Sequence, residues 1–176
     1  MKNMKKNEGF TLIELLIVVA IIGIIAAIAV PGLLRARQSG NEASAIGSVR
    51  AVNTAQQGYA QLCNGFANNL TMLGLAGAIA GTQPFLSPDM TVSNAIVKSG
   101  YNLSLGAGLN GIAVLTGPCA ADLPFTNYLM LARPSTVGST GTRSFASNNA
   151  GTIYQDVTGA ALAEPFLVVG NVSAIQ

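Results

Sequence analysis

Near its N-terminus the chain carries an apolar run that a soluble fold could hardly bury. Residues 15–30 read LLIVVAIIGIIAAIAV, sixteen positions without a polar side chain. The mostly apolar stretch extends over residues 10–34, which as a helix would measure about 37 Å at 1.5 Å per residue. The hydrocarbon core of a bilayer is about 30 Å thick. We therefore predict that residues 10–34 form a helix able to span a membrane.

Charged residues at the two ends of this run indicate its orientation. Lys2, Lys5 and Lys6 precede it, whereas Arg35 and Arg37 follow it. The three lysines favour a cytoplasmic N-terminus with the rest of the chain exported, and the two arginines weaken this asymmetry without reversing it. The remainder of the chain shows no basic stripe of the kind that binds nucleic acid, so we expect no direct nucleic-acid binding.

The composition excludes several classes of enzyme. Only 9% of the residues are charged, against about 25% in typical soluble domains. Histidine is absent, which removes His-ligated zinc and His-dependent nucleophilic catalysis. The acids beyond residue 63, namely Asp89, Asp122, Asp156 and Glu164, are scattered along the sequence. We therefore predict no catalytic residues, no metal site and no cofactor.

The apolar run allows three interpretations from its residues alone. It can be a plain membrane anchor, or a secretory signal peptide cleaved after the small residues Ala27 and Ala29. The third interpretation must account for Glu14, because a carboxylate inside an apolar run is costly unless it is paired or lies at the membrane edge. The residues leave open whether Glu14 is paired or simply lies near the lipid headgroups.

The sequence around Glu14 resembles a known signature. Residues 9–15, GFTLIEL, preceded by a short basic stretch and followed by an apolar helix and a proline, resemble the prepilin signature of type IV pilins and type II secretion pseudopilins. The resemblance covers about residues 1–60. It implies that a prepilin peptidase removes residues 1–9 by cleaving between Gly9 and Phe10, and that the new Phe10 amine is then N-methylated.

The resemblance also implies how the subunits assemble. In a filament, the Glu14 carboxylate would pair with the Phe10 amine of a neighbouring subunit inside an apolar bundle. Each charge alone would be expensive there, and pairing offsets much of that cost. Pro31 lacks a backbone N–H, so we expect a kink or local unwinding near residues 23–32 that helps the subunits pack.

The chain changes character after residue 34. Ile46, Val49, Val52, Tyr59 and Leu62 recur at spacings compatible with one helical face. We therefore predict one helix over about residues 11–62, whose second half, residues 35–62, is amphipathic. We expect the helix to end at residues 63–65, where an asparagine and a glycine suit a left-handed cap.

Residues 63–176 form the predicted globular head. A short helix is expected near residues 70–75. The strand candidates are residues 101–105, 111–115, 128–132, 143–147 and 152–156, and the last two flank a strong hairpin turn at residues 148–151. We predict an α+β fold in which an antiparallel sheet of about four strands packs on the amphipathic half of the helix, which is also the design that the pilin resemblance implies.

The chain has two cysteines, Cys63 and Cys119. Export would place both in an oxidising compartment, where a pair is usually bridged. We expect a disulfide between them, with two buried free thiols as the alternative.

The leading hypothesis for function is a structural one: a type IV pilin subunit that forms a helical homopolymer. It would begin as a prepilin in the bacterial inner membrane, with its head in the periplasm, contact lipid, prepilin peptidase and the pilus assembly machinery, and end in an extracellular filament. A type II secretion pseudopilin is the first alternative, and an anchored exported binding protein that never polymerises is the second. Motility, adhesion and DNA uptake all remain open.

Overall fold

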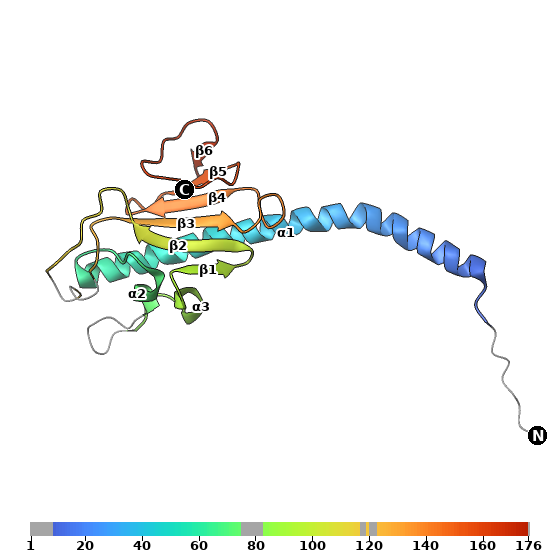
Figure 1. Cartoon of the computed structure of the whole chain (residues 1–176), viewed down its shortest axis with the longest axis horizontal. Helices are drawn as coiled ribbons and strands as arrows, with labels where there is room; N and C mark the ends of the chain where they lie inside the picture. The colour runs from blue at the N-terminus through green and yellow to red at the C-terminus, as the bar shows by residue number, and fades with distance from the viewer. Residues whose placement is uncertain (1–8, 75–82, 117–118, 120–122, 176) are drawn as a thin grey trace, which may run out of the picture. The chain divides into compact units, whose positions relative to one another are not determined.

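The structure is a computed structural model that describes residues 9–74, 83–116, 119 and 123–175. Within these residues, three helices precede six strands (Figure 1). The chain divides into two compact units, Met1–Ala36 and Arg37–Gln176. The helix α1 contributes residues to both units. Of the predicted leader, residues 1–9, all but Gly9 lie outside the described residues.

Helix α1 spans Leu12–Cys63, which confirms the helix predicted over residues 11–62. It ends as expected, because Asn64 takes a left-handed conformation with φ of 57°. The Asn64 N–H donates to the carbonyl of Ala60 at 3.0 Å. This bond satisfies one of the carbonyls that a helix C-terminus leaves without an intrahelical partner.

Pro31 lies inside α1 without interrupting it, since the helix is continuous on both sides of the proline. The expected local unwinding near residues 23–32 is therefore absent from the structure. Proline removes a single N–H donor from the helical ladder, and the neighbouring hydrogen bonds are sufficient to keep the turns on either side helical.

The head contains a six-stranded sheet in which sequential strands are neighbours and every pair is antiparallel (Figure 1). Two short helices precede it, α2 (Leu70–Gly74) and α3 (Pro88–Thr91), and α2 confirms the helix expected near residues 70–75. The strands are β1 (Ala95–Lys98), β2 (Tyr101–Ala107), β3 (Tyr128–Pro134), β4 (Ser144–Asn148), β5 (Ile153–Asp156) and β6 (Val172–Ala174).

The sequence prediction was right about the α+β class and the four central strands but wrong in two respects. The sheet has six strands rather than about four, because β1 and β6 add short edge strands of four and three residues. Such short segments carry too few alternating positions to stand out in a sequence. Residues 111–115 are not a strand, and only an isolated bridge joins Ala113 to Phe125.

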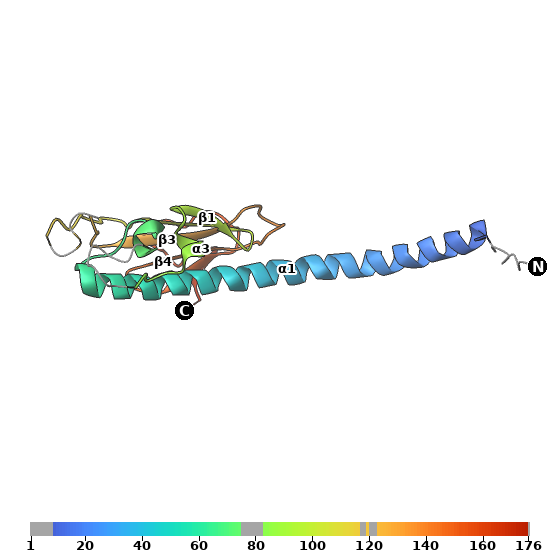
Figure 2. The same ribbon diagram turned by 90° about the horizontal axis from the view of Figure 1, so that it is seen from below.

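The core lies between one face of the sheet and the second half of α1, which runs along that face (Figure 2). From the helix come Val49, Val52 and Tyr59, all at most 1% exposed. Alternate residues of β2 and β3 face them, as the burial of Tyr101 and Met130 shows. The predicted apolar face of the helix is thus confirmed as core packing.

Candidate functional site

The N-terminal part of α1 presents its apolar side chains outward. Nothing in its most apolar window is buried, and among the described helices α1 alone is long and apolar enough to cross a membrane. Phe10, just before the helix, is 84% exposed, and Leu12 is 75% exposed. Exposed apolar surface of this extent marks a protein or membrane contact. We therefore expect a membrane or another protein to cover these side chains, which nothing covers in the isolated chain.

The one carboxylate of this segment lies at the start of the helix and is hydrogen-bonded there. Glu14 Oε2 accepts the backbone N–H of Thr11 at 2.9 Å and the Thr11 hydroxyl at 2.6 Å. In return, the Glu14 N–H lies 3.3 Å from Thr11 Oγ1. Threonine before the first helical residue and glutamate three positions later form a capping box. This role of Thr11 was not among the sequence-based predictions, although T-x-x-E is a pattern typical of a capping box.

The structure brings together only part of the predicted assembly site. Phe10 and Glu14 both lie at the start of α1, and Pro31 lies farther along the same helix. The predicted pairing of Glu14 with Phe10 joins two subunits, so a single chain cannot contain it. Cleavage after Gly9 and methylation of Phe10 likewise stay predictions.

The two cysteines form the disulfide Cys63–Cys119. This confirms the predicted bridge, which ties the last residue of α1 to the connection between β2 and β3. Both residues are fully buried. Because the bridge closes 56 residues of chain, the chain-entropy view assigns it about 4 kcal/mol of stabilisation.

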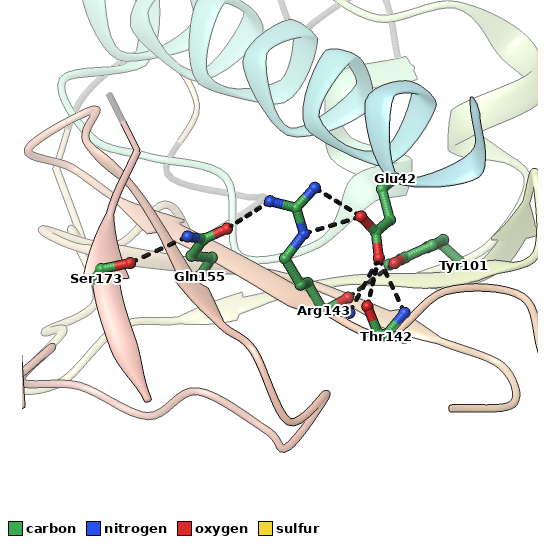
Figure 3. A network of polar contacts seen from close by, with 6 residues as sticks. All are labelled: Glu42, Tyr101, Thr142, Arg143, Gln155 and Ser173. Atoms are coloured by element: carbon green, nitrogen blue, oxygen red, sulfur yellow. Dashed lines mark hydrogen bonds and ion pairs between the residues drawn. The ribbon is translucent and has the colours of Figure 1, made fainter. Parts of the chain in front are cut away.

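An ion pair between a buried carboxylate and a partly exposed arginine links α1 to the sheet. Glu42, which is 6% exposed, accepts the Arg143 Nη2 at 2.6 Å and the Nε at 2.8 Å through its Oε2. Its Oε1 accepts three further bonds, from the N–H and hydroxyl of Thr142 and from the N–H of Arg143. Arg143 in turn donates to Gln155, which donates to Ser173 of β6 (Figure 3). The network therefore runs from the helix to the edge strand.

These contacts set the protonation state of Glu42. Burial raises the pKa of its carboxyl, but the hydrogen bonds from Thr142 and Arg143 outweigh burial, so the pKa lies below its usual value. Glu42 is therefore ionised at neutral pH. The Tyr101 hydroxyl donates to the carbonyl of Arg143 at 2.8 Å, and burial together with the Glu42 charge raises the pKa of this phenol.

Two neutral polar side chains of α1 make further buried contacts with the head. The Asn53 amide donates to Ser147 Oγ at 2.9 Å and accepts the Tyr128 hydroxyl at 3.0 Å. Gln56, with no exposed surface, donates to the carbonyl of Ala67 and accepts the N–H of the same residue. No local sequence pattern indicated these partners or Arg143. Among the described residues, no group of three acidic, cysteine or histidine side chains could hold a metal ion.

The N-terminal part of the chain matches a known family. The family described as "Prokaryotic N-terminal methylation motif" matches residues 4–30. Among curated proteins, the chain is 48% identical over 54 residues to the type IV major pilin protein PilA of Myxococcus xanthus, and 41% identical over 75 residues to the type IV wide pilus major component PilA4 of Thermus thermophilus. Over this N-terminal part, the chain is therefore similar to type IV pilins and carries their methylation motif.

A secretion protein is also among the relatives. The chain is 39% identical over 59 residues to the type II secretion system core protein G of Vibrio cholerae. The chain spans 24% of the Myxococcus protein, 57% of the Thermus protein and 40% of the Vibrio protein, and the aligned residues make up 31%, 41% and 34% of the chain. No solved structure matches it significantly. The similarity to these relatives therefore covers less than half of the chain.

Proposed function

We propose that this chain is a type IV pilin, the structural subunit of a pilus, and that it polymerises through its N-terminal helix. The observation that carries the proposal is an apolar helix whose outward-facing side chains have no cover, with a single carboxylate held at its start. Such a helix suits lipid before assembly and a bundle of identical helices afterwards. The subunit acts by assembly and is not an enzyme.

Processing would create the charge that Glu14 needs. Cleavage between Gly9 and Phe10 removes the leader of residues 1–9 and leaves a positive amine on Phe10, which is then methylated. In the filament, the Glu14 carboxylate pairs with the Phe10 amine of a neighbouring subunit. An ion left unpaired in an apolar bundle costs several kcal/mol, so only a neighbour whose amine reaches Glu14 is accommodated. The pair thereby sets the axial position of each subunit.

The apolar N-terminal segment also indicates where the chain lies before it enters the filament. The prepilin would lie in the bacterial inner membrane, with a cytoplasmic N-terminus and a periplasmic head. Prepilin peptidase and the assembly machinery of the inner membrane would be its partners before it enters an extracellular homopolymer. Pro31, whose turn lacks one helical hydrogen bond, would let α1 adjust when neighbouring helices pack against it.

The type II secretion pseudopilin is the alternative, and the match to the Vibrio core protein G favours it. Such a subunit would polymerise through the same helix into a short periplasmic filament. Electron microscopy of material sheared from the cell surface distinguishes a pilin from a pseudopilin. A pilin yields long extracellular filaments, whereas the short filament of a pseudopilin stays in the periplasm. An anchored protein that never polymerises would yield neither kind of filament.

The substitution Glu14→Ala tests the polymerisation mechanism. Membrane insertion should persist, because the change removes a charge from an apolar segment. Assembly should fail or fall sharply, because the incoming amine would enter an apolar bundle without a partner. The measurement is the ratio of sheared surface pilin to total membrane pilin, with Ile13→Val as a matched control in the same turn. Normal assembly of correctly cleaved Glu14→Ala would refute the pairing.

A further inference from the structure

Both hydrogen bonds that Thr11 donates to the Glu14 side chain reach the same carboxylate oxygen. Its N–H and its hydroxyl both donate to Oε2, at 2.9 Å and 2.6 Å. A carboxylate has about four acceptor positions on two oxygens. The Oε1 atom therefore keeps its lone pairs for another donor while Oε2 is held by the capping box.

The hydrogen bonds from Thr11 stabilise the Glu14 carboxylate before assembly. In the unassembled subunit Glu14 lies at the edge of an apolar membrane segment, where a carboxylate without hydrogen bonds is expensive. Thr11 supplies two donors from within the same chain. One of them is a helix N-terminal N–H, which has no carbonyl partner inside the helix. The positive end of the helix dipole also favours a negative charge at this position.

We propose that Thr11 is a positioning residue for assembly: its hydroxyl and N–H hold Glu14 Oε2 in the unassembled subunit and leave Oε1 to receive the Phe10 amine of a neighbour. This inference rests on the proposed Glu14–Phe10 pairing. It adds that the carboxylate is held in place by its own chain before the partner arrives. The capping box fixes the rotamer of Glu14, so that docking of the amine does not have to order this side chain.

Two substitutions of Thr11 separate its hydroxyl from its size. Thr11→Val keeps the branched shape and removes the hydroxyl donor. Thr11→Ser keeps the donor and removes the methyl group. Both are made in the full-length pilin in its native cells. Ile13→Val serves as the control, because it trims a side chain in the same turn without touching the capping box.

The readouts are the ratio of sheared to membrane pilin and the intact mass of the processed protein. Loss of a hydrogen bond to a charged group is expected to lower the assembly ratio of Thr11→Val about ten-fold. Thr11→Ser and Ile13→Val should assemble as the parent does, and all three variants should show the same processed N-terminus. Rescue by serine identifies the hydroxyl, which a merely space-filling role would not require.

Glu14→Gln distinguishes failure of this inference from failure of the pairing. Glutamine keeps an oxygen for the capping box but carries no charge for the amine, so it should not assemble. If Glu14→Gln fails while Thr11→Val assembles normally, the pairing stands and the role of Thr11 is overturned. If Thr11→Ser or Ile13→Val is as defective as Thr11→Val, the hydroxyl is not responsible and the inference is again overturned. If Glu14→Gln assembles normally, the pairing and the inference fall together.

Discussion

Replacing Glu42 by glutamine is expected to destabilise the Arg37–Gln176 unit. The carboxylate is 6% exposed and accepts five hydrogen bonds, from Thr142 and Arg143. Glutamine has nearly the same shape, but it offers one acceptor oxygen in place of two and turns an amide donor toward a guanidinium. The substitution therefore removes the charge without creating a cavity.

The size of the effect follows from the exposure of the two partners. Removing one member of a fully buried ion pair costs about 3–5 kcal/mol, because the other charge is left uncompensated. The Arg143 side chain is 37% exposed, so water can compensate part of its charge, and glutamine can still accept from Thr142. We expect a loss of about 2 kcal/mol, which for a chain of this size lowers Tm by about 4–8 °C.

The pH dependence of this difference gives a sharper test. Because the folded-state pKa of Glu42 is lowered from 4.5, the unfolded chain binds more protons in the acid range. The stability that Glu42 contributes is therefore complete above pH 4.5 and is lost as the pH falls through the folded-state pKa. The Tm gap between parent and Glu42→Gln should be widest at neutral pH and narrow in acid.

The assay is thermal unfolding of the whole protein in detergent micelles, monitored by near-ultraviolet circular dichroism of its tyrosines. Asp89→Asn is the control, because it breaks the exposed Lys98–Asp89 ion pair and exposed pairs contribute little. It should leave Tm unchanged. A Tm gap for Glu42→Gln that stays constant from neutral to acidic pH would show that the charge of Glu42 does not stabilise the fold.

Three further outcomes are expected. The intact mass of the exported protein should correspond to a chain that begins at Phe10 and carries one extra methyl group. A chain starting at Val30 would indicate an ordinary signal peptide instead. Cys119→Ser should lower the free energy of unfolding by about 4 kcal/mol, measured in urea, while membrane insertion persists; equal stability with and without the bridge would contradict this. Tyr128→Phe leaves the buried Asn53 Oδ1 without the tyrosine hydroxyl and should cost about 1–3 kcal/mol, also measured in urea.

Local patterns in the sequence determined a large part of this protein. Three features depend only on residues close to one another in the sequence: the apolar run, the GFTLIEL signature and the helical face of Val49, Val52 and Tyr59. They can therefore be recognised without knowledge of the fold. The four central strands were predictable for the same reason, since their alternation is local. With only two cysteines in the chain, the Cys63–Cys119 pairing had one possible solution once export was assumed.

Tertiary structure alone decided which polar groups meet. Glu42 and Arg143 are 101 residues apart, and Asn53 and Tyr128 are 75 residues apart. Their contacts depend on how α1 is aligned along the sheet, which no local pattern encodes. The edge strands β1 and β6 likewise exist because a neighbouring strand supplies their hydrogen bonds. A short segment gains a strand's backbone bonds only when a partner already lies beside it, so these features appear only once the whole head has folded.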